Sequence, residues 1–333
     1  VFDLCTAILW AQGFSLNDKW NDVVRDFKSN NLLQMQPLNG TGFLQSLALL
    51  DSLEKKRANP KSRLAVGSRK RDIMELDKST VEKWLKILFG GYKEASAFMM
   101  GQRILSERIL PYSTMIRPLA AIFADIKNRK GDINAKAAWP KIRQWYWCSV
   151  FSQRYSGPVE TYSALDFEQV VSWVDGGPEP EAVRTFIFRS DAIQEISSIR
   201  NAIYKGVLCL LAQNGAMDFS GGGGLNVQIF HDTQQDHHHI FPTKALKELE
   251  ISDPRANTIV NKTLISATAN RSISGNKPSN YVQNWRDKLG AASYDDILRS
   301  HAIDSNILSQ DNWQAFIVDR RERLCRMIES VCK

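Results

Sequence analysis

Residues 236–242 read Asp-His-His-His-Ile-Phe-Pro, three histidines followed by a short apolar stretch that ends in proline. The chain has five histidines, and a fourth, His231, lies five residues upstream of this run. Adjacent side chains of a strand point to opposite faces, so His238 and His239 are expected to have different tasks. One imidazole can bind a metal ion. The other can accept a proton from water, because the ordinary pKa of histidine is near neutral.

The sequence around this run predicts a small module of strands and helices. Residues 225–230 alternate between apolar and polar side chains, which is typical of a strand, and shorter strands are expected at about 236–240 and 262–266. A helix is expected from Ala267, and further helix from residue 278 to the end. The four glycines at 221–224 lack the lysine of a phosphate-binding loop and are interpreted as a linker.

The segment from Asp236 to Tyr281 resembles the HNH, or ββα-metal, nuclease motif, especially the HNH domain of RNA-guided DNA-cutting effectors. The order of the matching residues carries this resemblance. The stretch 239–242 matches the motif that holds the general base, which makes His239 the expected base. His238 takes the place of a metal-binding aspartate, and Asn270 matches the second metal ligand. Asn261 matches a central asparagine that orients the base, and residues 278–279 match the closing Pro-Ser.

This resemblance implies phosphodiester hydrolysis assisted by a divalent metal, with Mg²⁺ expected and Mn²⁺ as the alternative. His238 and Asn270 would bind the ion, and water and phosphate oxygens would complete its coordination. Asp236 and His237 are expected to lie around the metal site without binding the ion directly. A packed strand histidine is the plainer alternative for His239. The residues expected to contact DNA phosphates near this site are Lys262, Arg271 and Lys277.

Residues 1–215 are predicted to form an α-helical domain, and residues 216–333 a small α+β HNH domain. The chain as a whole is therefore expected to be mainly α. Apolar side chains recur at helical spacing between Phe43 and Leu53, and a long helix is expected from Asp191 to Leu211. Ser79 with Glu82 has the form of a capping box at the start of another helix.

A wider resemblance covers nearly the whole chain. Leu-Pro-Tyr at 110–112, the aromatic stretch 145–157 and the HNH segment together are similar to the C-terminal half of GmrSD-type and SspE-like modification-dependent restriction endonucleases. In that family a nucleotidase and modification-sensing domain precedes this region, so an N-terminal part absent from this sequence is expected. The resemblance implies cutting of modified or foreign DNA in defence against phage.

Charge also favours a nucleic-acid partner, because the chain carries a formal net charge of +7. The stretch 55–71 contains basic residues and no acid, although a solvated surface accounts for it equally well. The five cysteines are scattered and form no Cys-x-x-Cys pair, which fits a reducing cytoplasm, and no stretch is long and apolar enough to span a membrane. The candidate DNA-binding residues of this stretch are Lys55, Lys56, Arg57, Arg69, Lys70 and Arg71.

Two other functions remain open from the sequence. The same motif could cleave RNA, or the histidines could hold an ion in a nucleic-acid-binding adaptor that does not catalyse. One active site per chain favours nicking of one strand, whereas a homodimer would allow both strands to be cut.

Overall fold

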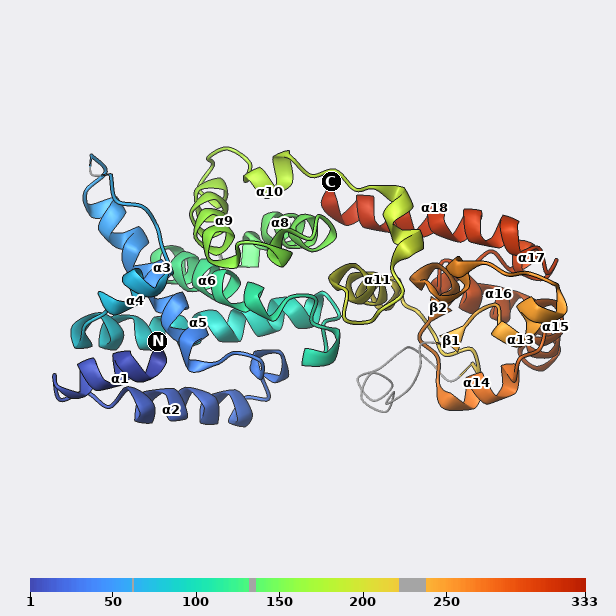
Figure 1. Cartoon of the computed structure of the whole chain (residues 1–333), viewed down its shortest axis with the longest axis horizontal. Coiled ribbons are helices and arrows are strands. Elements are labelled where there is room, and N and C mark those ends of the chain that lie inside the picture. The colour runs from blue at the N-terminus through green and yellow to red at the C-terminus, as the bar shows by residue number, and fades with distance from the viewer. Residues whose placement is uncertain (62, 132–135, 222–237) are drawn as a thin grey trace. The chain divides into compact units, whose positions relative to one another are not determined.

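The computed structural model describes residues 1–61, 63–131, 136–221 and 238–333, and helices dominate these ranges (Figure 1). They form two compact units. The first comprises residues 1–101, 112–186 and 332, and the second comprises residues 102–111, 187–331 and 333. The boundary predicted at residue 215 falls inside the second unit, just after α11 (Ala202–Gln213). The predicted strand at 225–230 and the glycines at 222–224 lie outside the described residues.

The first unit is built from helices around a buried central helix, α6 (Ile116–Lys130). An unbroken run from Leu119 to Ala124 is buried on α6, which packs against α3, α5 and α9. None of the helices in the described ranges is long and apolar enough to cross a membrane. The other helices of this unit are α1 (Phe2–Trp10), α2 (Leu16–Ser29), α3 (Gly40–Ala58), α4 (Lys70–Met74), α5 (Lys78–Gly101), α8 (Trp139–Phe151), α9 (Val159–Val174) and α10 (Glu181–Arg184).

A glycine permits the close approach of α5 to α6. A Cβ atom added at Gly91 would lie 2.3 Å from the carbonyl oxygen of Ala120 and 2.7 Å from the Cβ of Ala124. Both distances are shorter than real contacts allow, so only glycine fits between these two backbones. The predicted apolar periodicity between Phe43 and Leu53 is confirmed, since both residues are buried on α3.

The start of α5 differs from the predicted capping box. Asp77, not Ser79, accepts the hydrogen bond from the Thr80 amide at 2.8 Å, and the Ser79 hydroxyl itself donates to the same carboxylate oxygen. An aspartate just before a helix satisfies a free amide as well as serine does and adds a favourable charge at the helix N-terminus. These hydrogen bonds lower the pKa of Asp77.

The second unit contains a two-stranded antiparallel sheet among helices. Strand β1 (His238–His239) pairs with β2 (Lys262–Thr263), with His238 opposite Thr263 and His239 opposite Lys262. In the described residues β1 ends at His239, one residue before the predicted end, and β2 is shorter than the predicted 262–266, whereas α14 begins at Ala267 as expected. The remaining helices of this unit are α13 (Thr243–Glu248), α14 (Ala267–Ile273), α15 (Pro278–Leu289), α16 (Ala291–Ser300), α17 (Ser305–Leu308) and α18 (Trp313–Cys332).

The long helix predicted from Asp191 to Leu211 is wrong in its first half. Residues 190–195 form a 3₁₀ helix, residues 196–201 are irregular, and α11 begins at Ala202 with Asn201 as its N-cap. The backbone amide of Ile259 donates to the carbonyl oxygen of Ile196 at 2.8 Å. This tertiary hydrogen bond uses a carbonyl that a continuous helix would need for itself, so the apolar periodicity does not decide the structure here.

Candidate active site

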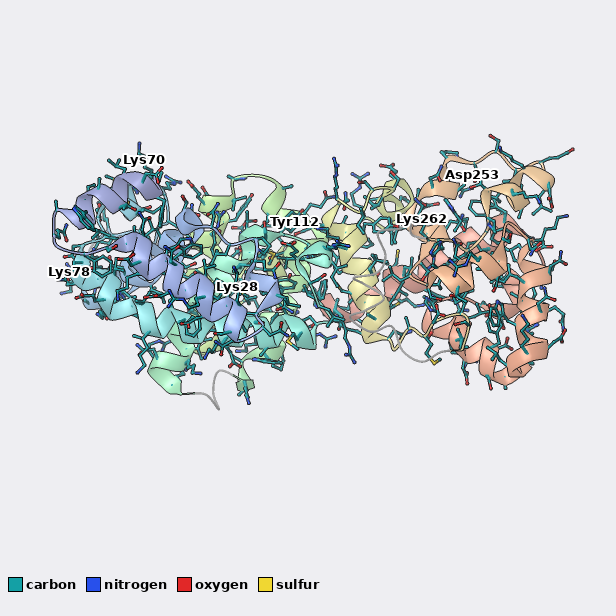
Figure 2. All side chains as sticks on the ribbon, turned by 90° about the horizontal axis from the view of Figure 1, so that it is seen from below. Lys28, Lys70, Lys78, Tyr112, Asp253 and Lys262 are labelled. Atoms are coloured by element: carbon teal, nitrogen blue, oxygen red, sulfur yellow. The ribbon has the colours of Figure 1, made fainter. Side chains whose placement is uncertain are left out.

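The two strands and α14 border one cleft of about 810 Å³ in the second unit. His238 and His239 line it from β1, Lys262 from β2, and Asn270 and Arg271 from α14. Figure 2 labels Lys262 on β2 and Asp253 in the loop that joins the strands. The structure thus brings together the predicted base, both predicted metal ligands and two of the predicted phosphate contacts.

The two histidines differ in exposure, as the alternation of strand side chains predicts. His238 is 6% exposed, whereas His239 is half-buried. The Nε2 atom of His239 lies 3.0 Å from the Oδ1 atom of Asn257, in the connecting loop. Asp236 and His237, predicted to surround the metal site, lie outside the described residues.

Asn261 is fully buried and holds the loop that follows β1. Its Oδ1 atom accepts a hydrogen bond from the Phe241 amide at 2.8 Å, and its Nδ2 atom donates to the carbonyl oxygens of Phe241 at 3.0 Å and Ala256 at 2.9 Å. Its own backbone carbonyl accepts from the Ile240 amide at 2.9 Å. Asn261 therefore joins both ends of the loop between the strands.

Aromatic side chains of α15 and α18 fix the residues after β1. The Tyr281 hydroxyl, buried on α15, donates to the carbonyl oxygen of Ile240 at 2.9 Å. The Phe241 ring packs against Trp313 and Phe316 of α18, with centroid distances of 5.4 and 5.0 Å. The backbone beside His239 is therefore held by packing as well as by hydrogen bonds.

A buried arginine on α18 holds the other side of the same loop. Arg320 donates from Nη1 to the carbonyl oxygens of Ile259, Val260 and Lys262, at 3.2, 2.5 and 2.9 Å, and reaches the His301 carbonyl oxygen at 3.4 Å. Burial lowers the pKa of Arg320 to about 9. Sequence reasoning missed this residue because a lone arginine on an amphipathic helix gives no sign of its partners.

The start of α14 is fixed by a carboxylate from outside the predicted motif. Asp218 accepts from the Ser266 amide at 2.6 Å and from its hydroxyl at 2.9 Å, while Ser266 caps the helix by accepting from the Ala269 amide. Burial acts to raise the pKa of Asp218, but hydrogen bonds from Ser220 and Ser266 outweigh it, and the net shift is downward. Asp218 thereby orients the helix that presents Asn270 and Arg271.

His301, at the end of α16, has a hydrogen-bond partner at each of its ring nitrogens. Its Nδ1 atom lies 2.6 Å from the Thr263 hydroxyl, and its Nε2 atom lies 2.6 Å from the Met217 carbonyl oxygen. Because a carbonyl only accepts, Nε2 carries the proton and Nδ1 accepts from Thr263. Burial lowers the pKa of His301 to about 4.

A further part of the cleft lining comes from the irregular segment before α11. Ser197, Ser198 and Ile199 line it, together with the buried Tyr204 of α11. Both serines are exposed on this segment. The sequence pattern predicts a helix interior for this segment and therefore does not indicate its place in the cleft.

The donors present fit one kind of metal site. An imidazole nitrogen from His238 and an amide oxygen from Asn270 suit a divalent ion that keeps most positions for water or phosphate. They do not suit a closed structural zinc site, which needs four side-chain donors. In the described ranges, no three His, Cys, Asp or Glu side chains gather as a metal cluster.

Predicted basic contacts outside the cleft have other surroundings. Lys277 is the N-cap residue of α15 and does not line the cleft. In the first unit, much of the basic stretch is paired with acids of the same unit. Its ion pairs are Lys55 with Asp51 at 2.7 Å, Lys56 with Glu168 at 2.5 Å, Arg57 with Asp125 and Arg71 with Asp72 at 3.2 Å, while Arg69 donates to the Thr161 hydroxyl at 3.3 Å and Lys70 is exposed.

The aromatic stretch 145–157 forms core and a buried ion pair in the first unit. The guanidinium of Arg154 contacts the Asp166 carboxylate at 2.9 Å, and the Tyr155 hydroxyl donates to the same carboxylate at 2.9 Å. Asp166 is fully buried. A paired and hydrogen-bonded charge of this kind holds helices together, and it accounts for these residues without a catalytic role.

Comparison with curated proteins gives a distant relative. The chain is 28% identical over 290 residues to a Methanocaldococcus jannaschii protein named "Uncharacterized protein MJ0686". The aligned region covers 82% of this chain and 43% of the archaeal protein, so the chain spans less than half of that relative's length. A scan against protein-family profiles finds no match.

Proposed function

We propose that this chain is a metal-dependent endonuclease of the ββα-metal, or HNH, class that hydrolyses phosphodiester bonds in DNA. The observation that carries the proposal is the cleft that His238, His239 and Asn270 share, bordered by a strand pair and the helix that follows it. Asn261 supports it further, because its side chain holds the backbone that carries the proposed base, as the resemblance implies.

His238 and Asn270 would hold the divalent ion, for which Mg²⁺ is proposed and Mn²⁺ is the alternative. Bound there, the ion would neutralise charge that develops on the phosphate and on the leaving oxygen. His239 lines the same cleft as these two residues, which supports a role for it in the same reaction.

His239 would act as the general base. It takes a proton from a water molecule, whose oxygen forms a bond to phosphorus as the bond from phosphorus to the 3′ oxygen breaks. The leaving 3′ oxygen takes a proton from solvent, so the products are 5′-phosphate and 3′-hydroxyl ends. Lys262 and Arg271, which line the cleft, would contact the flanking phosphates and position the strand without reading its sequence.

Plasmid nicking tests this assignment. Wild type, His239→Ala and Asn270→Ala are compared with Mg²⁺, with Mn²⁺ and with a chelator, and Asn306→Ala serves as an exposed-asparagine control from the same unit. We expect metal-dependent relaxation by wild type and by the control. In both site variants the relaxation rate should be lower by roughly 100-fold or more. Equal relaxation by all four proteins would contradict the site. Parallel incubation with RNA distinguishes the ribonuclease alternative, and DNA binding without cutting would favour the adaptor.

Restriction of modified or foreign DNA is the biological role that we propose for this activity. It rests on the resemblance to modification-dependent endonucleases, in which a nucleotidase and sensor domain is the partner of this region. Cleavage by this chain of matched plasmids with and without modified bases tests whether it selects modified DNA; equal cleavage of both plasmids would contradict that role for this chain.

A further inference from the structure

We propose that Asn257 is the positioning residue for His239, fixing the imidazole so that Nδ1 is the nitrogen that takes the proton. This inference rests on the proposed nuclease function. No part of the resemblance includes Asn257, which lies four residues before Asn261 at the end of the 3₁₀ helix Pro254–Asn257.

The contact between the two side chains determines the tautomer. Nε2 of His239 lies 3.0 Å from the carbonyl oxygen of the Asn257 side chain. A carboxamide oxygen only accepts hydrogen bonds, so Nε2 must donate and must therefore carry the proton of the neutral ring. The lone pair then belongs to Nδ1, which becomes the basic nitrogen.

The backbone of Asn257 is fixed from both sides, so its exposed side chain has a rigid base. The preceding residue, Ala256, accepts a hydrogen bond from Asn261 at 2.9 Å. The hydroxyl of the following residue, Thr258, donates to the Arg255 carbonyl oxygen at 2.8 Å. The resemblance gives Asn261 the task of orienting the base. In this structure two residues share that task, since Asn261 holds the backbone and Asn257 contacts the ring.

The short turn that carries Asn257, residues 254–257, is itself held by a strong carboxylate contact. Asp253 accepts from the Arg255 amide at 2.8 Å and from the Trp313 indole nitrogen at 2.9 Å. The hydrogen bond from the Arg255 side chain is the largest cause that lowers the pKa of Asp253, to about 2. The turn is therefore part of the rigid unit and does not depend on His239 for its conformation.

Single-turnover cleavage of a short DNA duplex tests the proposal by a double-mutant cycle. Asn257→Ala is expected to lower the maximal cleavage rate roughly 10- to 100-fold, with little change in the protein concentration that gives half of that rate. The same change made in His239→Ala is expected to have no further effect, because Asn257 acts only through the ring. Asn257→Asp keeps an acceptor oxygen and should retain the Nε2–H tautomer, and Asn306→Ala should behave as wild type.

Nitrogen-15 chemical shifts of the His239 ring give a reading that needs no activity. The neutral ring should show a protonated Nε2 in wild type and in Asn257→Asp, and a mixture of tautomers in Asn257→Ala. A protonated Nδ1 in wild type would overturn the proposal. So would an equal loss of cleavage rate when Asn257→Ala is made in wild type and in His239→Ala. If wild type cuts no nucleic acid, the nuclease assignment fails, while the ring shifts still decide whether Asn257 fixes the tautomer.

Discussion

The side chain of Asn261 makes hydrogen bonds to both the amide and the carbonyl oxygen of Phe241, at 2.8 and 3.0 Å, and is completely shielded from solvent. It thus satisfies both backbone polar groups of Phe241, which lies two residues beyond His239. A buried backbone group left without a partner costs about 1–3 kcal/mol, so this single amide has a large effect on the loop.

Asn261→Ala is expected to lower the free energy of unfolding by roughly 2–4 kcal/mol, because it leaves the Phe241 and Ala256 groups unsatisfied and creates a small void. Urea unfolding followed by tryptophan fluorescence measures the change, and Trp313, packed on Phe241, reports on this unit. The exposed Asn306→Ala should stay within about 0.5 kcal/mol of wild type. If Asn261→Ala lowers the free energy of unfolding by no more than about 0.5 kcal/mol, the backbone groups of Phe241 and Ala256 have found other partners.

Stability should fall between pH 7 and pH 5 because of His301. Its pKa in the folded protein, about 4, lies below the ordinary value of 6.5, since burial disfavours the charged ring. Between these two values the unfolded chain binds the proton and the folded chain does not, so stability is full above pH 6.5 and decreases as pH falls toward 4. The loss between pH 7 and pH 5 is on the order of 2 kcal/mol. Among the groups near the ring, the Met217 carbonyl and Asp218 act to raise its pKa, whereas Arg320 acts to lower it.

His301→Gln isolates this contribution, because a glutamine can hydrogen-bond to the same neighbours but does not titrate. Unfolding midpoints measured at pH 7 and pH 5 should lie closer together in this variant than in wild type. Asp218 and Asp253 also contribute stability that is lost in acid, since the pKa of each is lowered in the folded protein. That loss falls mainly below about pH 5 and is the same in wild type and in His301→Gln. An unchanged difference between the two midpoints would exclude His301 as the cause.

Arg320→Met is expected to destabilise the second unit by on the order of 3 kcal/mol. The change removes donors from the carbonyl oxygens of Ile259, Val260 and Lys262, and relief from burying a charge offsets only part of that cost. The neighbouring Arg321, which makes a 3.4 Å ion pair with the exposed Asp191, is a matched control, and Arg321→Met should cost less than about 1 kcal/mol. Thermal unfolding measures the loss of stability in each variant. A similar loss in Arg320→Met and Arg321→Met would show that the carbonyls are satisfied without Arg320.

Local sequence pattern predicted the parts of this fold that depend on neighbours in the chain. The helix from Ala267 begins at the expected residue because Ser266 caps it, and the burial of Phe43 to Leu53 follows from helical spacing. The break at 196–201 could not be predicted in the same way, because it depends on a hydrogen bond between Ile196 and Ile259, residues far apart in sequence. The same limit applies to the site. Its histidines and Asn270 were named from the motif, whereas Asn257, Asp218 and Arg320 act through contacts that only the folded chain brings together.

Arg271 and Lys56 differ in their partners, a neutral hydroxyl for Arg271 and a carboxylate for Lys56, and the salt dependence of DNA binding can measure the consequence. Arg271 is an exposed residue that lines the cleft, and its guanidinium makes a 3.3 Å hydrogen bond to the neutral Thr268 hydroxyl. Lys56, from the predicted basic stretch, forms a 2.5 Å ion pair with Glu168. A cation already paired with a carboxylate releases fewer counterions when it meets a phosphate, so only Arg271 is expected to contribute fully.

Binding of a DNA duplex is therefore measured over a range of salt concentrations for wild type, Arg271→Ala and Lys56→Ala, with the metal omitted to prevent cutting. Arg271→Ala should weaken binding uniformly across sequences and reduce the slope of log K against log salt by about 1. Lys56→Ala should leave that slope unchanged. The reverse result would move the principal DNA contact from the cleft to the basic stretch of the first unit, because a phosphate would then have to displace Glu168 from Lys56 in the complex.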